Sequence, residues 1–180
     1  SSVTIPNSVI IIEKNAFRDC IGLNSVIIPN SVTSIGLNAF ENCQNLTSVT
    51  IPNSVTEIGC DAFRYCLRLT SVSIPNSITM INSYTFAFCE SLTSVTIPNS
   101  VITIGDNAFN RCTNLSSVTI PNSVKNVNYS AFCDCKKLIS ITIPNSITSI
   151  ETGAFQNCIN LENVCCCAEK VPITHNLVFD

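Results

Sequence analysis

The segment LTSVTIPNSVTEIGCDAFRYCLR, residues 46–68, decides the fold, because the rest of the chain repeats it. The tetrapeptide Ile-Pro-Asn-Ser marks each copy and recurs every 23 residues without insertion or deletion. One such unit is too short to bury a hydrophobic core by itself, whereas stacked units bury a continuous one. The sequence therefore predicts a solenoid. The tetrapeptides begin at Ile5, Ile28, Ile51, Ile74, Ile97, Ile120 and Ile143.

Apolar residues in the first half of the unit predict a short strand. Leu46, Val49 and Ile51 follow the spacing L-x-x-L-x-L, and Val49 and Ile51 alternate with polar residues, which places both on one face. We expect the strands of successive coils to pair in parallel. Pro52 ends the strand because it has no N–H donor, and the Asn-Ser pair after it favours a turn.

The second half of the unit predicts a more irregular stretch. Val55 and Ile58 indicate a second extended segment that also points inward. The next position holds Gly in some coils and Asn in others, which predicts a positive φ angle. These residues are Gly36, Gly59, Gly105, Asn82 and Asn128.

An Ala-Phe pair closes the unit and predicts a short helical turn. Phe63 and Cys66 are three residues apart, so one turn would direct both inward. The residue before Ala-Phe has a side chain typical of helix N-caps, and Asn38 with Glu41 has capping-box spacing. The expected N-caps are Asn38, Asp61, Asn107 and Ser130.

The composition excludes several classes of partner. Hydrophobic residues make up 46% of the 180 residues, enough for one domain with a substantial core. Charged residues make up 12% and the net charge is −3, so no basic footprint for a nucleic acid is present. No run reaches the roughly 18 apolar residues that a membrane-spanning helix needs. We expect neither nucleic-acid binding nor membrane insertion.

Seven of the 12 cysteines form a column with the same 23-residue spacing. In-register neighbours of a parallel stack hold their Cβ atoms nearly 5 Å apart, outside the usual disulfide range of about 3.5–4.5 Å. Because free cysteine packs as a small hydrophobic residue, we expect buried, reduced thiols rather than a metal ladder or a disulfide chain. The column comprises Cys20, Cys43, Cys66, Cys89, Cys112, Cys135 and Cys158.

The pattern LxSVxIPNSVTxIGxxAFxxCxx resembles the BspA-like leucine-rich repeat, the 23-residue class also called the TpLRR type. The match runs from Val3 to about Leu161. We expect a single domain with a repeat array at residues 1–161 and a degenerate final repeat at 162–180, within a longer chain. The resemblance implies a right-handed leucine-rich-repeat solenoid, with a parallel β-sheet on one face and short helical turns and irregular extended segments on the other.

The same resemblance implies a non-catalytic binding or adhesion module of a cell-surface or secreted protein. A structural spacer and an intracellular scaffold are the alternatives. The exposed end coils also predict end-to-end or edge self-association. No family property identifies the ligand, which we expect to be a protein or a glycan.

Catalytic chemistry finds little support. His175 is the only histidine and lies in the atypical final segment, so a histidine-dependent hydrolase would need its base at the irregular end of the array. Glu13 and Glu151 occupy the same coil position but lie six coils apart, so they do not form a carboxylate pair. We expect no enzyme, no cofactor and no metal.

The cysteines outside the column lack the C-x-x-C spacing of a zinc site. Cys133 lies two residues from Cys135, and the final three are adjacent. We expect Cys166 to replace a core Ile while its neighbours point outward; an exposed reactive or intermolecular thiol is the alternative. The three adjacent residues are Cys165, Cys166 and Cys167.

Residues that flank the inward Val and Ile of each strand must face outward. They predict a flat, almost uncharged face of hydroxyl groups, which suits a repeating ligand such as a glycan or a fibrous protein, because weak contacts accumulate along the array. The alternatives are small residues that merely tolerate close stacking and form hydroxyl ladders, or an ice-binding surface. The predicted binding residues are Ser25, Ser48, Thr50, Ser71, Ser73, Ser94, Thr96, Ser117, Thr119, Ser140 and Thr142.

Sequence variation among the coils concentrates on the opposite, helical-turn side. A partner that is selected by specific side chains would use this edge, where Tyr65 and Phe88 lie one coil apart as an aromatic anchor or as an incidental exposed pair. The predicted alternative edge comprises Arg64, Tyr65, Phe88 and Arg111.

Overall fold

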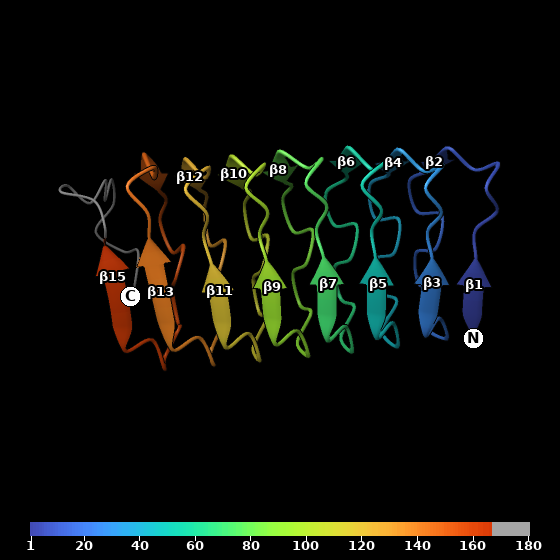
Figure 1. The fold of residues 1–180 in the computed structure, drawn as a ribbon. Coiled ribbons are helices and arrows are strands. Elements are labelled where there is room, and N and C mark those ends of the chain that lie inside the picture. Colours follow the sequence, from blue (N-terminus) through green and yellow to red (C-terminus); the bar gives the residue numbers. More distant parts are fainter. Residues whose placement is uncertain (167–180) are drawn as a thin grey trace.

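The computed structural model describes residues 1–166 and shows them as a solenoid of stacked coils (Figure 1). We call residues that occupy the same position in successive coils a column. The predicted solenoid with a 23-residue repeat is confirmed. Counted from the first strand residue, coils 1 to 7 comprise residues 2–24, 25–47, 48–70, 71–93, 94–116, 117–139 and 140–162.

One side of the solenoid is an eight-stranded parallel sheet, to which each coil contributes one strand (Figure 1). Neighbouring strands pair in register one coil apart, so Val26 lies opposite Val49 and Val49 opposite Val72. The predicted parallel stacking is therefore confirmed. The strands are β1 (Ser2–Thr4), β3 (Ser25–Ile27), β5 (Ser48–Thr50), β7 (Ser71–Ser73), β9 (Ser94–Thr96), β11 (Ser117–Thr119), β13 (Ser140–Ile143) and β15 (Asn163–Cys166).

Two-residue strands form a second, interrupted face. They pair in parallel as a three-stranded sheet, β2-β4-β6, and a four-stranded sheet, β14-β12-β10-β8, with the break between coils 3 and 4. The strands are β2 (Ile11–Ile12), β4 (Ser34–Ile35), β6 (Glu57–Ile58), β8 (Met80–Ile81), β10 (Thr103–Ile104), β12 (Asn126–Val127) and β14 (Ser149–Ile150).

The segment that contains Ala-Phe forms consecutive turns, and no helix occurs within residues 1–166. Its backbone N–H groups alternate between two kinds of acceptor. The Ala16 N–H donates locally to Glu13 O, whereas the next one, from Phe17, donates to Ala39 O in the adjacent coil. A helix needs successive N–H groups to point along its own axis. The prediction of short helical turns is therefore wrong, because half of these donors hold the coils together.

The residues predicted as N-caps have left-handed backbone instead. Their φ angles are 55° at Asn38, 56° at Asp61, 54° at Asn107 and 52° at Ser130. Asn and Asp tolerate this conformation better than most residues because their short polar side chains bond locally. A second left-handed column follows four residues later in each coil, as at Asn42.

The prediction of positive φ at Gly36, Gly59, Gly105, Asn82 and Asn128 is wrong. The glycines are required by close approach of the coils. A Cβ atom on Gly59 would lie 2.5 Å from the Leu37 nitrogen of the preceding coil, and one on Gly36 would lie 2.6 Å from the Lys14 nitrogen.

Asn82 explains the break in the second face. In coils 2 and 3 the glycine N–H of this column donates to the preceding coil, as from Gly59 to Ile35 O. In coil 4 the side-chain Nδ2 of Asn82 donates to Ile58 O at 2.6 Å instead. The side chain lies between coils 3 and 4 and replaces a backbone hydrogen bond, so the short strands do not pair there.

The core between the faces is continuous. Seven phenylalanines, from Phe17 to Phe155, stack with ring centroids 5.1–5.6 Å apart and interplanar angles of at most 13°. The inward residues predicted from the repeat are buried, including Leu46, Val49 and Ile58. The apolar period thus predicted the core correctly.

Candidate binding surfaces

The outward residues of the eight-stranded sheet form two exposed columns. In β5, Ser48 and Thr50 are exposed while Val49 between them is buried, and β7, β9, β11 and β13 repeat this alternation. The strand register aligns the predicted residues along the solenoid. Ser25, Ser48, Ser71, Ser94, Ser117 and Ser140 form one column, and Thr50, Ser73, Thr96, Thr119 and Thr142 form the other.

The hydroxyl groups of these two columns are not used by the fold. Within residues 1–166 none of them donates a hydrogen bond to a protein atom, whereas hydroxyls of the adjacent column do. There, Thr70 Oγ1 donates to Thr47 O at 3.1 Å, and Thr47 Oγ1 donates to Asn24 O at 3.2 Å. The adjacent column thus uses its hydroxyls to bond backbone carbonyls of the preceding coil, whereas the predicted binding hydroxyls have no protein acceptor within residues 1–166.

A shallow groove runs along the solenoid at the edge of the Thr50 column. Its larger part has a volume of about 760 Å³ and spans coils 4 to 7, and a second part of about 500 Å³ spans coils 2 to 4. None of the residues that line either part is charged. The second wall consists of exposed asparagines that follow each Ile-Pro: Asn30, Asn53, Asn76, Asn99 and Asn122.

Sequence reasoning assigned these asparagines to turn chemistry and missed them as surface residues. Asn53 is exposed and its side chain makes no hydrogen bond within residues 1–166. The serines that follow Asn30, Asn76 and Asn99 instead bond across coils, as from Ser100 Oγ to Ile78 O at 2.6 Å. An amide repeated at the same exposed turn position in every coil was the signal that could have identified the groove.

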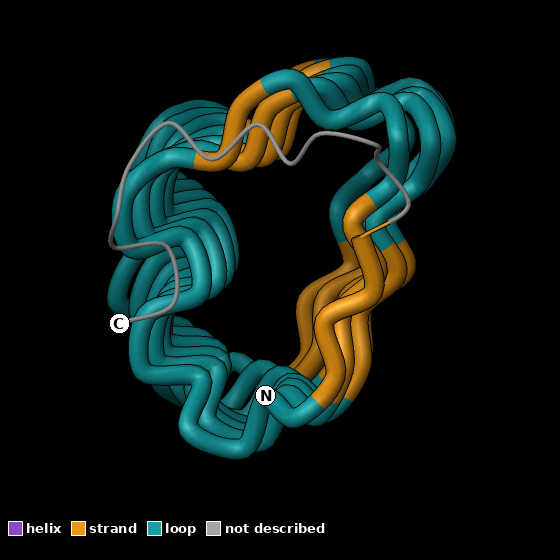
Figure 2. Tube along the Cα trace, turned by 90° about the vertical axis from the view of Figure 1, so that its left-hand side faces the viewer, coloured by secondary structure: helices purple, strands orange, loops and turns teal. Residues whose placement is uncertain are grey.

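The turn segments lie across the coil from the eight-stranded sheet, which is the orange band on the right in Figure 2. On this turn face the four predicted edge residues come together. The rings of Tyr65 and Phe88 stack with centroids 4.3 Å apart, and the guanidinium carbon of Arg64 lies 4.8 Å from the centre of Tyr65. The guanidinium carbon of Arg111 lies 5.4 Å from the centre of Phe88.

Tyr84 is a further member of this cluster, which its position in the repeat did not predict. The Tyr84 ring centre lies 5.0 Å from the guanidinium carbon of Arg64. Its column holds Asn, Asp, Ser or Gly in the other six coils, so its repeat position alone favours a backbone role.

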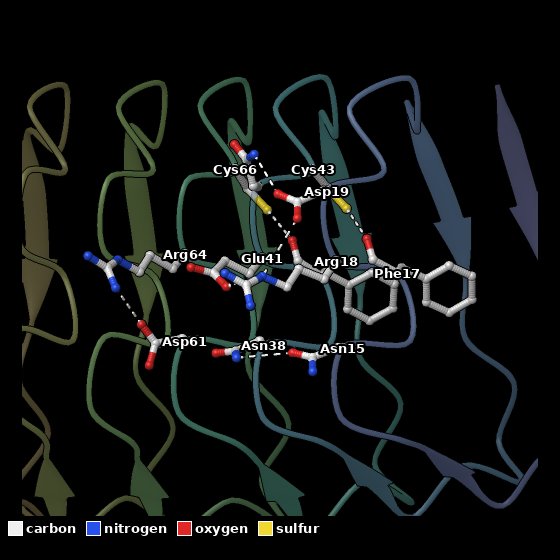
Figure 3. Close-up of polar contacts among 12 residues, drawn as sticks. Asn15, Phe17, Arg18, Asp19, Asn38, Glu41, Cys43, Asp61, Arg64 and Cys66 are labelled. Atoms are coloured by element: carbon white, nitrogen blue, oxygen red, sulfur yellow. Dashed lines mark hydrogen bonds and ion pairs between the residues drawn. The ribbon is translucent and has the colours of Figure 1, made fainter.

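Four carboxylates on the turn face form ion pairs with arginines: Asp19, Glu41, Asp61 and Asp134. Figure 3 shows Arg18, Glu41 and Arg64 in neighbouring coils, with an ion pair of 2.9 Å between Arg18 Nε and Glu41 Oε2. Arg64 Nη1 pairs with Asp61 Oδ1 at 3.0 Å. Within residues 1–166 no group of three or more His, Cys, Asp or Glu side chains is placed to hold a metal ion.

The cysteine column is buried from Cys43 to Cys158 and its thiols are free. Each donates to the carbonyl of a phenylalanine in the preceding coil, as from Cys43 Sγ to Phe17 O at 3.1 Å (Figure 3). Burial raises the pKa of Cys43 and Cys158 to about 12, and it raises the pKa of Cys66 and Cys89 well above 9.0. The predicted burial of this column is confirmed for these coils.

The final cysteines extend only partly into the described residues. Cys165 is exposed and free, and it pairs in register with Thr142. The backbone of Cys166 pairs with Ile143, the register expected for a replaced core residue. Cys167 and His175 lie outside the described residues.

Parallel coils, an uncharged sheet face and a buried thiol column define a leucine-rich-repeat solenoid of the kind that serves as a binding or scaffold module. Six copies of the BspA type leucine rich repeat region match residues 1–101 and 79–179. The chain belongs to this family, as the resemblance of its repeat predicted. Proteins of this family are generally not enzymes.

Solved structures agree with this assignment. The leucine-rich repeat protein TpLRR from T. pallidum is 32% identical, with a TM-score of 0.83 over 89% of this chain and 78% of that one. A leucine-rich repeat protein from Eubacterium ventriosum is 30% identical, with a TM-score of 0.77 over 95% of this chain and 44% of that one.

A leucine rich cell surface protein from Faecalibacterium prausnitzii is 27% identical, with a TM-score of 0.56 over 94% of this chain and 60% of that one. This chain therefore spans about half of the length of two of these three relatives. No curated protein matches the chain. The part of the chain that the structure describes contains no helix long and apolar enough to cross a membrane.

Proposed function

We propose that this chain is an adhesion module of a cell-surface or secreted protein, and that its eight-stranded sheet face binds a repeating, uncharged protein or glycan ligand. The observation that carries the proposal is the pair of exposed hydroxyl columns that make no hydrogen bond within residues 1–166. Each coil offers the ligand the same groups in the same register, so weak contacts add up along the array.

The groove beside the Thr50 column supports a ligand that runs along the solenoid axis. It crosses several coils and offers threonine hydroxyls on one wall and asparagine amides on the other. Both groups donate and accept hydrogen bonds. Because no lining residue is charged, a neutral polymer fits better than an acidic or basic one. The surface location is supported by the relative described as a cell surface protein.

The test is a glycan and matrix-protein binding array that compares the chain with a variant carrying Thr50→Lys, Thr96→Lys and Thr142→Lys. Long charged side chains in three coils would occupy the groove edge and prevent the ligand from contacting the neighbouring coils. We therefore expect avidity to fall at least about 100-fold. A matched variant with Ile10→Lys, Thr79→Lys and Ile102→Lys adds the same charge at exposed positions outside the groove and should bind normally.

A binder that tolerates the three changes in the groove would place the site elsewhere. Absence of any binder would favour the scaffold alternative. Thermal hysteresis in the same sample would assign the hydroxyl face to ice, whereas an adhesion module should show none.

A further inference from the structure

Coils 3 to 5 differ from the other coils in what they place at a left-handed backbone position. The column of Asn42 has φ near 60° throughout, and the outer coils fill it with Asp or Asn. Coils 3, 4 and 5 fill it with Tyr65, Phe88 and Arg111, at φ angles of 59°, 62° and 58°. Bulky residues are unfavourable in this conformation, and such strain concentrates at functional sites.

A fourth residue repeats this exception nearby. Tyr84 has a φ angle of 57° in the other left-handed column, where coil 2 has Asn38 and coil 5 has Asn107. Four strained residues thus lie in three adjacent coils: the rings of Tyr65, Tyr84 and Phe88 surround Arg64, and Arg111 lies over Phe88. Asparagine at these positions would satisfy the backbone equally well, so the fold itself does not call for the aromatic side chains.

The geometry of the rings determines what they offer to a partner. Tyr65 and Phe88 occupy equivalent positions one coil apart, and their rings stack at 4.3 Å with an interplanar angle of 29°. The ring faces therefore turn toward neighbouring coils and the ring edges turn outward. Aromatic edges carry partial positive charge and prefer the face of another aromatic ring or an anionic group.

Arg111 adds hydrogen-bond donors beside these edges. Its side chain is 56% exposed, and its Nε forms an ion pair with Asp134 Oδ2 at 3.6 Å, a separation longer than a hydrogen bond. Within residues 1–166 its guanidinium makes no hydrogen bond, although it carries five donors in a planar fork that matches a carboxylate. The guanidinium carbon of Arg111 lies over the Phe88 ring, 5.4 Å from its centre, so this fork stands at one end of the ring stack.

We propose that Arg64, Tyr65, Tyr84, Phe88 and Arg111 form a second binding site, for a protein segment in which an Asp or Glu adjoins an aromatic residue. The carboxylate binds the fork of Arg111, and the partner's ring packs with its face on the edges of Tyr65 and Phe88. A sugar would need an open aromatic face to stack on, and these rings turn their faces to each other. The site lies across the coil from the sheet face (Figure 2), so both sites can be occupied together.

The experiment is a selection of short random peptides displayed against the intact chain, followed by fluorescence anisotropy with the enriched peptides. Sequences that combine an acidic and an aromatic residue should be enriched. Their dissociation constant should rise about tenfold with Arg111→Gln and at least as much with the double variant Tyr65→Asn and Phe88→Asn. The variant with three lysines on the sheet face is the matched control and should bind these peptides normally.

Stability separates a binding role from a structural one. Because Asn42 and Asn157 occupy the same column, the double asparagine variant should melt within about 4 °C of the parent chain. If it unfolds, the exposed Arg111→Gln still decides the question. The proposal is overturned if acidic and aromatic peptides are not enriched, if they bind the variants unchanged, or if a uronic-acid oligosaccharide rather than a peptide loses binding in these variants.

Discussion

The sheet face and the turn face are built from the same 23-residue unit, yet they accept different chemistry. Outward positions of the strands hold Ser or Thr in nearly every coil, whereas the column of Tyr65 holds Asp, Asn, Tyr, Phe and Arg. Strand pairing sets neighbouring side chains about 4.8 Å apart over the whole sheet. In the turn segments, the outward side chains extend from residues with left-handed backbone conformation. Repetition therefore favours avidity on one face, and variation allows selectivity on the other.

The buried side of the turn segments varies little between coils, unlike their exposed side. The phenylalanine stack and the thiol column lie directly beneath the variable side chains, and both are nearly invariant in all seven coils. The same turn thus combines a fixed inner half and a free outer half. Four predictions test this division, beginning with the one that affects the whole array.

Alkaline pH should unfold the chain through the thiol column, while the sheet face has nothing comparable to titrate. Burial raises the pKa of Cys43 and Cys158 from 9.0 to about 12, so the folded state keeps protons that the unfolded state releases. Stability is therefore complete below about pH 9 and is lost as the pH rises toward 12, by about 1.4 kcal/mol per pH unit for each such thiol. Urea unfolding at a series of pH values measures this slope.

Replacing one thiol gives the control for that experiment. Cys89→Ala removes a group whose pKa is raised by burial. The slope of unfolding free energy against pH should therefore decrease by the amount that one buried thiol contributes. An unchanged slope would show that other groups cause the alkaline transition.

Two phenylalanines two residues apart should contribute very differently to the free energy of unfolding. Phe86 is fully buried between Phe63 and Phe109, and Phe86→Ala should lower the free energy of unfolding by about 3–5 kcal/mol. Phe88 lies on the outer half of the turn, and Phe88→Asn should change it by less than about 1 kcal/mol, because relief of left-handed strain offsets the lost ring contacts. Equal losses in urea denaturation would contradict the division into inner and outer halves.

Because the coils approach closely at only one of two glycines, replacing each by alanine should change stability in opposite directions, with a smaller difference than between the two phenylalanine variants. Gly59→Ala places a Cβ atom 2.5 Å from the Leu37 nitrogen and should destabilise the chain by about 1–3 kcal/mol. A Cβ atom on Gly22 would meet nothing within 4 Å beyond its chain neighbours, and its φ is not left-handed, so Gly22→Ala should stabilise by about 0.4–1 kcal/mol. Thermal unfolding of both variants measures the pair, and a neutral Gly59→Ala would show that the coils can separate at no cost.

The sequence predicted what depends on the period and missed what depends on contacts between coils. Burial of Leu46, Val49 and Phe63 followed from their recurrence, and the strand register followed from the constant repeat length. The helical turn was wrong because Asn-Ala-Phe suits an N-cap and a left-handed residue equally well. Cross-coil donors such as the Phe17 N–H decide between them, and one unit read alone does not contain them.

The candidate sites show the same limit. The hydroxyl columns follow from strand alternation, and Tyr65 with Phe88 follows from their positions one coil apart. Tyr84 and the groove asparagines were missed because their positions suggested backbone roles. Only the structure shows that Tyr84 lies beside Arg64 and that Asn53 makes no hydrogen bond within the described residues.

The smallest expected effect separates hydroxyls that hold the coils together from hydroxyls that remain for a ligand. Thr70 and Ser71 are adjacent and exposed, but Thr70 Oγ1 donates to Thr47 O at 3.1 Å, and the Ser71 hydroxyl has no protein acceptor within residues 1–166. Thr70→Ala should lower the free energy of unfolding by about 0.5–1 kcal/mol, and Ser71→Ala should change it by less than about 0.5 kcal/mol. If Ser71→Ala proved as damaging in urea denaturation, the sheet-face hydroxyls would belong to the fold, and the binding surface would have to be sought on the turn face alone.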